Sequence, residues 1–352
     1  MHVAEMDYEI APEIRKVLTD LISNSDVGYL GPFPELAPAF QHYAKTTWGW
    51  EFDPSHIRFA TDVGVAATEI MRVLTKPGDK VLLNSPVYTN FSFWVKEVGA
   101  IPHDVPLIRD DNTWRLDLDG IEAAMASGIK VYMLCSPQNP VGRIHTREEL
   151  QFISDAANKH GVVVIADEIH APLAYEKFTP YLSIPGSEKN GILITSNSKS
   201  WNTAGLKAAF YMTQSEELNK RISGMPEAMH WRSSLLGAFA MATAYAECGY
   251  WMDQTKVRLQ ENLKFLKAEL AEHLPKAQVS NVQATYLAWI DLSAYGVERP
   301  AAKILKDGKV AVVAGEEHAP ELRYTDFVRF NFGSSKSRIA EAVRRMRLGL
   351  ES

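Results

Sequence analysis

Lys199 is the residue of this sequence that is best placed for carbonyl chemistry. It lies in a turn of small polar residues, Ser196-Asn197-Ser198-Lys199-Ser200, directly after the apolar run 191–195. A neutral lysine amine condenses with an aldehyde, and the pKa of a lysine falls when the amine is desolvated or lies near another cation. Lys207, eight positions further on, is such a cation. Lysines followed by serine are common on protein surfaces, so this segment alone does not establish a reaction.

Three other short apolar runs are each followed by a residue that could bind an aromatic ligand. The run 80–83 leads to Tyr88, whose ring could stack, and the run 130–135 leads to Asn139, whose amide stands in a proline-flanked turn. The run 162–166 leads to the carboxylate of Asp167. Ligands of a doubly wound sheet collect at the carboxyl ends of its strands. We therefore expect a ring, an amide, a carboxylate and the amine of Lys199 to share one site.

The elements that must position these residues alternate along the first two thirds of the chain. Strands are predicted at 80–83, 130–135, 162–166, 192–195 and 208–212, and most of these runs are apolar throughout, as in strands buried on both faces. Helical patterns lie between them. One runs to Leu74, and another opens at Thr146, which can form a capping box with Glu149. The alternation predicts an α/β fold with a mostly parallel sheet covered by helices.

The pattern changes near residue 250. A long helix is predicted at 252–273, followed by strands at 285–292, 310–313 and 327–332 and a last helix at 336–348. We expect an N-terminal arm over residues 1–27 that joins the small domain, a large domain over 28–249, and a small α+β domain over 250–352.

Composition narrows the classes of protein. The 352 residues carry a formal net charge of −6 with both signs interspersed, which gives no support to nucleic-acid binding. The first residues lack the basic and apolar regions of a signal peptide, and no stretch approaches eighteen apolar residues, so neither export nor a membrane partner is expected. The two cysteines, Cys135 and Cys248, favour reduced thiols over a disulfide framework. Together these features predict a cytoplasmic protein.

Other cofactor classes lack their motifs. The ten histidines are dispersed and no His-Glu-x-x-His or paired Cys-x-x-Cys occurs, so no metal site is expected. The glycine-rich turn of nicotinamide dehydrogenases and the Gly-Lys-Ser/Thr of P-loop proteins are also missing.

The motifs in their order resemble the fold-type I enzymes that use pyridoxal 5′-phosphate, of the class I/II aminotransferase superfamily. Within these, the chain is most similar to the cystathionine β-lyase or cysteine-S-conjugate β-lyase branch. The resemblance implies a PLP-dependent transferase-like fold, with a three-layer α/β/α large domain and a smaller α+β domain. It rests on the segments 3–8, 28–29, 86–88, 136–142, 167–170, 196–199, 204–207 and 328–332.

The resemblance also implies roles for the residues singled out above. Lys199 would form the Schiff base with the cofactor and remove the substrate Cα proton, while Asp167 would pair with the pyridine nitrogen. Asn139 would donate to the phenolic oxygen, and the ring of Tyr88 would stack. Arg329, in the alternating strand 327–332, would bind the substrate carboxylate as a two-pronged partner.

Further residues would complete the cofactor site. The phosphate would be held by the N–H groups of Val63 and Gly64 and by Ser196, Ser198 and Lys207. Asp62 stands where relatives carry a small residue, and an acid beside a phosphate is repulsive unless its side chain turns away. His170 occupies the place of a tyrosine that contacts the phenolic oxygen in many aminotransferases, and either this contact or a purely structural role is consistent with the sequence. Tyr29 matches a tyrosine that reaches the phosphate in the neighbouring subunit, which implies a homodimer.

The resemblance implies a C–S β-lyase that cleaves L-cystathionine or related cysteine thioethers by α,β-elimination, with release of a thiol such as homocysteine, pyruvate and ammonia. The same residues would also serve transamination, and some members of the fold family are regulatory or partner-binding proteins that retain the cofactor. The chain departs from the pattern of this family at two places, both near the expected substrate entrance. The chain begins directly at the 3–7 motif, and the segment 314–320 is acidic where relatives have a more glycine-rich and aromatic loop.

Overall fold

A central seven-stranded sheet organises the first two thirds of the computed structural model, which describes residues 1–352. Its strand order is β1-β9-β8-β7-β6-β2-β3, and only β9 runs antiparallel to its neighbours. The predicted mostly parallel sheet is therefore confirmed. Its strands are β1 (Arg58–Ala60), β2 (Lys80–Leu83), β3 (Ile101–Asp104), β6 (Val131–Cys135), β7 (Val163–Asp167), β8 (Gly191–Thr195) and β9 (Ala209–Met212).

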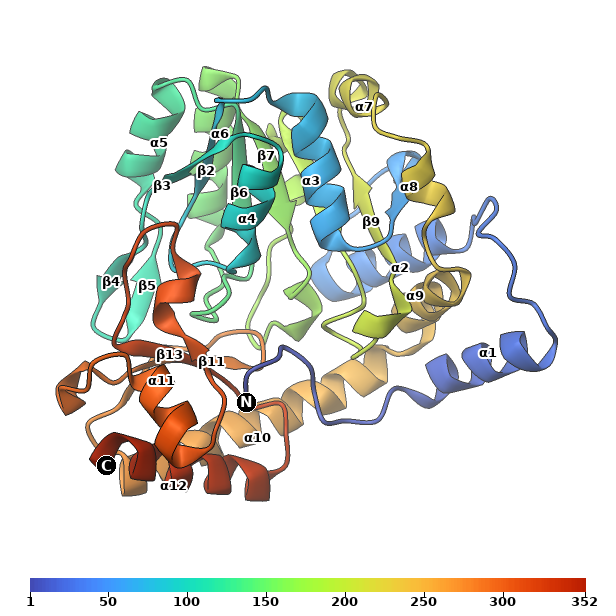
Figure 1. Ribbon diagram of the computed structural model, residues 1–352. Coiled ribbons are helices and arrows are strands. Elements are labelled where there is room, and N and C mark those ends of the chain that lie inside the picture. Colours follow the sequence, from blue (N-terminus) through green and yellow to red (C-terminus); the bar gives the residue numbers. More distant parts are fainter.

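Helices cover both faces of this sheet (Figure 1). Along β6 the side chains of Val131 and Met133 enter one core with α3, α4 and α7, whereas those of Tyr132 and Leu134 enter a second core with α2, α5, α6 and α9. Each fully buried aliphatic side chain of this kind contributes about 1.5–3 kcal/mol. The helices are α2 (Leu36–Trp48), α3 (Val63–Leu74), α4 (Asn90–Glu97), α5 (Leu118–Ala126), α6 (Arg147–His160), α7 (Glu216–Ile222), α8 (Ala228–Trp231) and α9 (Leu235–Glu247).

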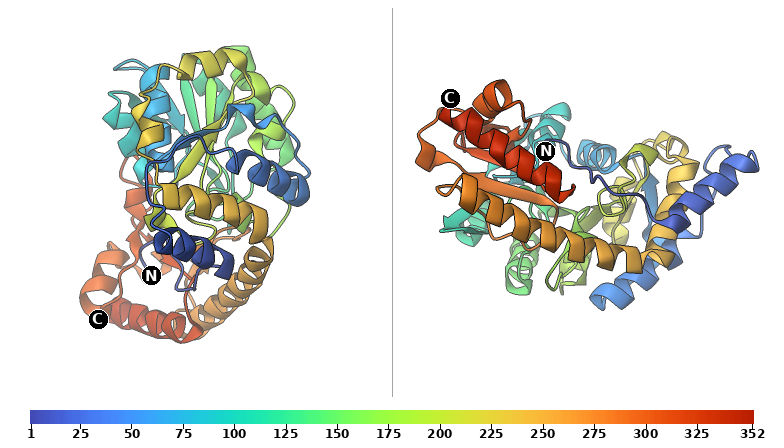
Figure 2. Two further views of the ribbon diagram at one scale, coloured as in Figure 1. Left: turned by 90° about the vertical axis from the view of Figure 1, so that its right-hand side faces the viewer. Right: turned by 90° about the horizontal axis from the view of Figure 1, so that it is seen from below.

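A four-stranded antiparallel sheet of order β10-β11-β13-β12 forms the C-terminal part. The long helix α10 (Gly249–His273) runs from the large sheet to this one and packs against α12 (Lys336–Glu351), as Figure 2 shows from below. The strands are β10 (Gln278–Val279), β11 (Leu287–Asp291), β12 (Val313–Ala314) and β13 (Phe327–Asn331), and the short helix α11 (Pro300–Lys303) precedes β12. The predicted limits of the domains, at residues 27 and 249, stay a prediction.

Most predicted elements have the expected ends to within a few residues. Thr146 accepts a hydrogen bond from the backbone N–H of Glu149, and the Glu149 side chain accepts one from the Thr146 N–H, so the capping box is confirmed. The strand predicted at 310–313 is wrong, because only Val313 and Ala314 pair with β13. A π-helical turn at Ile304–Gly308 and a left-handed Lys309 come first, and the chain reaches the sheet edge only after them.

Several elements were not predicted. They include helix α1 (Pro12–Ser23), the edge strands β1 and β3, and the hairpin of β4 (Ile108–Asp110) and β5 (Thr113–Arg115). The edge strand β3 contains a proline, a histidine and an aspartate, so its sequence lacks the continuous apolar run of a central strand. No helix has the length and apolar character needed to span a bilayer.

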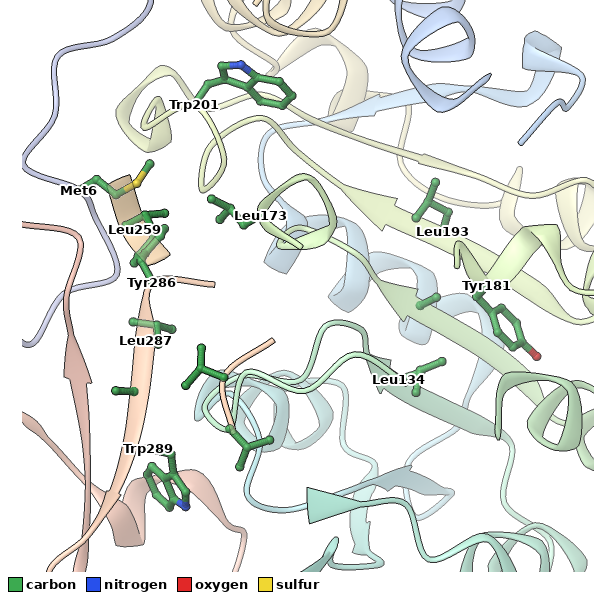
Figure 3. Close-up of a cluster of buried hydrophobic side chains, with 14 of the residues drawn as sticks. Met6, Leu134, Leu173, Tyr181, Leu193, Trp201, Leu259, Tyr286, Leu287 and Trp289 are labelled. Carbon is green, nitrogen blue, oxygen red and sulfur yellow. The ribbon is translucent and has the colours of Figure 1, made fainter. Parts of the chain in front are cut away.

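One hydrophobic core joins the two sheets and the N-terminal segment. Figure 3 shows Leu134 and Leu193 of the large sheet in one cluster with Leu287 and Trp289 of β11, and Met6 lies at the edge of the same cluster. Residues 1–8 are also tied by hydrogen bonds. The Asn331 Nδ2 of β13 donates to the carbonyls of Val3 and Glu5, both at 2.6 Å. The N-terminal segment therefore belongs to the folded core.

Asn262 of α10 is expected to be important for this assembly. Its Nδ2 donates to the carbonyls of Phe332 and Ser334 and to the hydroxyl of Tyr8. Asn262→Ala leaves buried carbonyls without donors and should lower stability by about 2 kcal/mol, measured as a lower thermal midpoint. Asn158→Ala removes an exposed amide donor to the Gly186 carbonyl and serves as the matched control. Equal midpoints for the two variants would contradict this account.

Candidate active site

A cavity of about 670 Å³ opens at the carboxyl ends of β6, β7 and β8. The structure brings nearly all predicted site residues to this cavity, although they come from distant parts of the chain. Those that line it are Val63, Gly64, Tyr88, Asn139, Asp167, His170, Ser196, Ser198, Lys199, Lys207 and Arg329. Tyr29 does not line it and is 87% exposed, so its predicted contact with a partner subunit stays a prediction.

The turn after β8 presents Lys199 to the cavity. Ser196 fixes this turn, because its hydroxyl donates to the Ala208 carbonyl at 2.7 Å and accepts from the Ser198 N–H at 3.0 Å. The Lys199 Nζ donates to the Ala4 carbonyl at 3.0 Å. Burial lowers the pKa of Lys199, and the charge of Arg329 adds to this effect, while that of Glu5 opposes it. The lowered pKa favours the neutral amine that carbonyl chemistry requires.

Asp167 is a buried carboxylate at the end of β7 with no ion-pair partner. Its Oδ1 accepts a hydrogen bond from the Ile169 N–H at 3.1 Å, and no cation lies within salt-bridge distance. Burial raises the pKa of Asp167 to about 7. A buried carboxylate is stable in its charged form only beside a positive group. A protonated pyridine nitrogen has the charge that this position lacks.

Arg329 lies in the cavity with neutral partners only. From β13, its Nη1 donates to the Asn139 Oδ1 at 3.4 Å and its Nη2 donates to the His2 carbonyl at 3.1 Å, whereas its buried Nε has no partner. Burial lowers the pKa of Arg329. A buried guanidinium with free donor capacity is suited to a carboxylate ligand, because the two groups match in charge and in planar geometry.

Two aromatic side chains complete the walls near the predicted cofactor ring. Tyr88 packs edge-on against Trp94, with ring centroids 5.7 Å apart, and accepts a hydrogen bond from Asn90 Nδ2 at 2.8 Å. His170 is buried and its Nδ1 has no partner. Burial lowers the pKa of His170 to about 3, so the ring is neutral at pH 7 and can accept or donate one hydrogen bond at each nitrogen position according to its tautomer. This environment is compatible with both roles considered for His170.

The predicted phosphate position lies at the start of α3. The backbone N–H groups of Val63 and Gly64 donate to no acceptor in the protein, as is usual for the first turn of a helix. Asp62 is closer to this position than expected: its Oδ1 accepts from the Val65 N–H at 2.8 Å, and its Oδ2 lies 3.3 Å from the Lys207 Nζ. The side chain of Asp62, which was expected to point away from the phosphate, thus contacts Lys207, the predicted phosphate-binding cation.

Sequence reasoning missed several contacts that hold the site together. The Ala4 carbonyl accepts hydrogen bonds from both Lys199 and the hydroxyl of Tyr286, the latter at 2.9 Å. His318 bridges to the loop that carries Tyr88, since its carbonyl accepts from the Val87 N–H at 2.9 Å and its Nδ1 lies 3.1 Å from the Thr89 hydroxyl. Backbone carbonyls carry no residue-type signal, so the Ala4 contact could not be found from sequence.

The comparisons with known proteins agree with this arrangement. The model of the family Aminotransferase class I and II matches residues 1–346. The chain belongs to this family. It covers 90% or more of the length of the first two relatives described next, so the match extends over most of their length.

Three similar proteins illustrate the match. A protein of Mycobacterium tuberculosis, provisionally named a cystathionine beta-lyase, is 36% identical over 98% of this chain and 90% of its own. Cystathionine beta-lyase PatB of Bacillus subtilis is 30% identical over 99% of this chain and 92% of its own. The solved structure of the PLP-bound C–S lyase of Staphylococcus hominis superposes with a TM-score of 0.93 at 25% identity, over 99% of this chain and 88% of that one. The predicted fold class is confirmed.

Pyridoxal 5′-phosphate fits the residues of the cavity. Asp167 can accept from a protonated ring nitrogen, and Asn139 and His170 line the same cavity. The amine of Lys199 can reach an aldehyde, and the free N–H groups of Val63 and Gly64 with Lys207 can hold a phosphate.

The raised pKa of Asp167 predicts a pH-dependent cost in the cofactor-free protein. The folded state binds this proton up to about pH 7 and the unfolded state only up to its model value of 3.8. Stability therefore falls as the pH rises between these values, and above pH 7 the charged form costs up to about 4 kcal/mol. Asp167→Asn should raise the thermal midpoint at pH 8, with a gain that shrinks toward pH 4.

Asp110→Asn, at an exposed position, is the control and should show no such pH-dependent gain. A cofactor-free Asp167→Asn protein that is no more stable than the parent at pH 8 would contradict the assigned burial cost.

Proposed function

We propose that this protein is a carbon–sulfur β-lyase that cleaves L-cystathionine or a related cysteine thioether to a thiol, pyruvate and ammonia. The predicted enzyme class and the predicted cofactor, pyridoxal 5′-phosphate, are confirmed by the relatives described above. The thioether substrate and the released homocysteine remain part of the proposal.

The observation that carries the proposal is the position of Lys199 in the cavity of a chain that is similar to cystathionine beta-lyase PatB over 92% of the length of that protein. When bound, the cofactor supplies an aldehyde for amino groups and a ring that accepts electrons from the substrate Cα. Burial lowers the pKa of Lys199, which favours the neutral amine that would remove the Cα proton. A thiolate that leaves from Cβ would then complete the elimination, and hydrolysis of the released enamine by water would give pyruvate and ammonia.

The other residues bind and orient. Arg329 would bind the α-carboxylate of the substrate with its free donors, and this contact fixes the Cα–H bond relative to Lys199. Asp167 would keep the ring nitrogen protonated, Tyr88 would stack on the ring, and Asn139 would donate to its phenolic oxygen. These roles are proposed from the shared cavity and from the charges of the side chains.

Transamination is the second candidate. It is supported by the family to which the chain belongs and by a relative from Aquifex aeolicus, named a probable aspartate/prephenate aminotransferase, that is 25% identical over 90% of this chain. A third candidate is a regulatory or binding protein that retains the cofactor. The three differ in products, since only the lyase releases pyruvate and a thiol from cystathionine.

We also propose a homodimer in which Tyr29 reaches the cofactor phosphate of the partner. The proposal is supported by the exposure of Tyr29, which is 87%, together with that of its neighbour Val27, which is 57%. Exposed apolar side chains that lie close together are typical of interaction surfaces. The cytoplasmic location stays a prediction.

Purified protein saturated with cofactor should convert L-cystathionine into free thiol and pyruvate in equal amounts. Thiol is measured with a chromogenic disulfide and pyruvate with lactate dehydrogenase. A parallel reaction contains an amino acid and 2-oxoglutarate and is assayed for glutamate. Glutamate without pyruvate would establish transamination in place of the lyase, and retained cofactor absorbance without either product would indicate a binding protein.

Lys199→Ala should abolish the covalent attachment of the cofactor. After borohydride reduction and proteolysis, the parent chain should carry the cofactor on the peptide that contains Lys199, and the variant should carry none. Lys189→Ala, at an exposed position outside the cavity, is the control and should be labelled like the parent. Labelling of the Lys199→Ala chain would show that a different lysine binds the aldehyde.

A further inference from the structure

The phosphate position contains a carboxylate of the protein itself. Asp62 is the N-cap of the twelve-residue helix α3, and its Oδ1 accepts from the Val65 N–H at 2.8 Å. Its Oδ2 lies 3.3 Å from the Nζ of Lys207. The same cavity wall contains the N–H groups of Val63 and Gly64, which have no acceptor in the protein. The carboxylate of Asp62 thus already contacts Lys207 and the N-terminus of α3, the two positive groups that would bind a phosphate.

We propose that Asp62 competes with the phosphate of the cofactor for Lys207 and for the N-terminus of α3, and thereby lowers the affinity of this enzyme for pyridoxal 5′-phosphate. Phosphate binding requires either that Asp62 gives up these contacts or that two anions share them. Both cases disfavour the bound phosphate relative to a neutral residue at position 62.

The electrostatic reasoning is direct. The N-terminus of a helix carries a partial positive charge equivalent to about half an elementary charge, and a lysine adds one full charge. The carboxylate of Asp62 offsets about one of these charges before any ligand binds. A phosphate that carries nearly two negative charges therefore meets about half a positive charge where a neutral residue 62 would leave about one and a half. The carboxylate also repels the phosphate directly, although solvent weakens this repulsion because the Asp62 and Lys207 side chains are 39% and 59% exposed.

The structure gives no second cation that could compensate Asp62. Its only ion-pair partner is Lys207, and Lys207 has no other acidic partner. The remaining phosphate contacts proposed here are neutral: Ser196, Ser198 and the two backbone N–H groups of the same chain, and the hydroxyl of the partner's Tyr29. Ser196 is itself engaged, since its hydroxyl donates to the Ala208 carbonyl at 2.7 Å. The balance of charge at the phosphate position thus depends on residue 62.

This inference depends on the cofactor and not on the bond that is cleaved, so it holds for a lyase and for an aminotransferase alike. Its consequence is a cofactor that dissociates readily and a protein whose loaded fraction follows the concentration of free pyridoxal 5′-phosphate. We expect the effect to be specific for the phosphate, because the Asp62 side chain has its hydrogen bond and its ion pair with the first turn of α3 and with Lys207, both at the phosphate position.

The test measures cofactor affinity without using turnover. Holoenzymes of the parent and of Asp62→Asn are dialysed to equilibrium against graded concentrations of pyridoxal 5′-phosphate, and bound cofactor is read from its absorbance. A second series uses pyridoxal, which lacks the phosphate. Asparagine is as good an N-cap as aspartate, so the variant keeps the cap of α3 and removes only the charge. Asp62→Ser, another good N-cap, provides an independent neutral variant.

Asp117→Asn is the matched control. Asp117 caps α5 in the same manner, by accepting from the Gly120 N–H at 3.0 Å, and it does not line the cavity. We expect Asp62→Asn and Asp62→Ser to bind pyridoxal 5′-phosphate about three- to fivefold more tightly than the parent, in line with the strength of a charge contact between side chains that are 39% and 59% exposed. We expect the affinity for pyridoxal to stay within about twofold, and Asp117→Asn to match the parent with both ligands.

Each other result would overturn the proposal. Unchanged or weaker binding of pyridoxal 5′-phosphate in both Asp62 variants would show that Asp62 supports the phosphate site, for example by orienting Lys207. An equal gain with pyridoxal and with its phosphate would show an effect on the whole cavity and not on the phosphate position.

Discussion

The site depends on three ionisable side chains that are buried together without counter-ions. Lys199, Asp167 and Arg329 all line one cavity, and each has a pKa shifted toward its neutral form by burial. Desolvation of a charge is costly unless a partner compensates it. The three charged groups are desolvated together at this cavity, where they line a space that a ligand can fill. Amine, carboxylate and guanidinium then find complementary groups in one ligand and its substrate.

The rest of the structure keeps these groups apart and fixed. Asp167 and Lys199 follow the adjacent parallel strands β7 and β8, so the sheet sets their spacing. Arg329 comes from β13 of the other sheet, and the N-terminal segment closes the gap between the two, because its carbonyls accept from Lys199, Arg329 and Asn331. These contacts satisfy donors with neutral carbonyls, which leaves the positive charges available to anionic ligand groups.

The sequence predicts a residue's position best where that position depends on one strand alone. The central strands β2, β6, β7 and β8 are continuous apolar runs, and the polar residues after them must meet at one sheet edge. Asn139, Asp167 and Lys199 were therefore found correctly as neighbours. The edge strand β3 and helix α1 have weaker patterns, since their burial depends on partners far away in the chain.

Contacts between residues that are far apart in the chain could not be predicted from the sequence. The Ala4 carbonyl contacts Lys199 across 195 positions of the chain, and Asp62 meets Lys207 across 145. The family motifs indicated Asp62 as unusual but gave no reason to place its side chain on Lys207. The strand expected at 310–313 failed for a similar reason, because the end of the preceding π-helical turn decides where the chain reaches β13.

The proton chemistry proposed for the cavity depends on which side chain near the ring position can accept a proton from the substrate Cα. Burial lowers the pKa of His170 to about 3, so His170 stays neutral and is a poor base. Burial raises the pKa of Tyr88, so its hydroxyl stays protonated. Among the residues near the ring position, Lys199 has the lowered pKa of an amine that can both accept and return a proton. In the proposed mechanism, elimination and transamination would share this base, and the two reactions would diverge at the substituent on Cβ. Where a thiolate leaves from Cβ, return of the proton to the carbon skeleton is unnecessary.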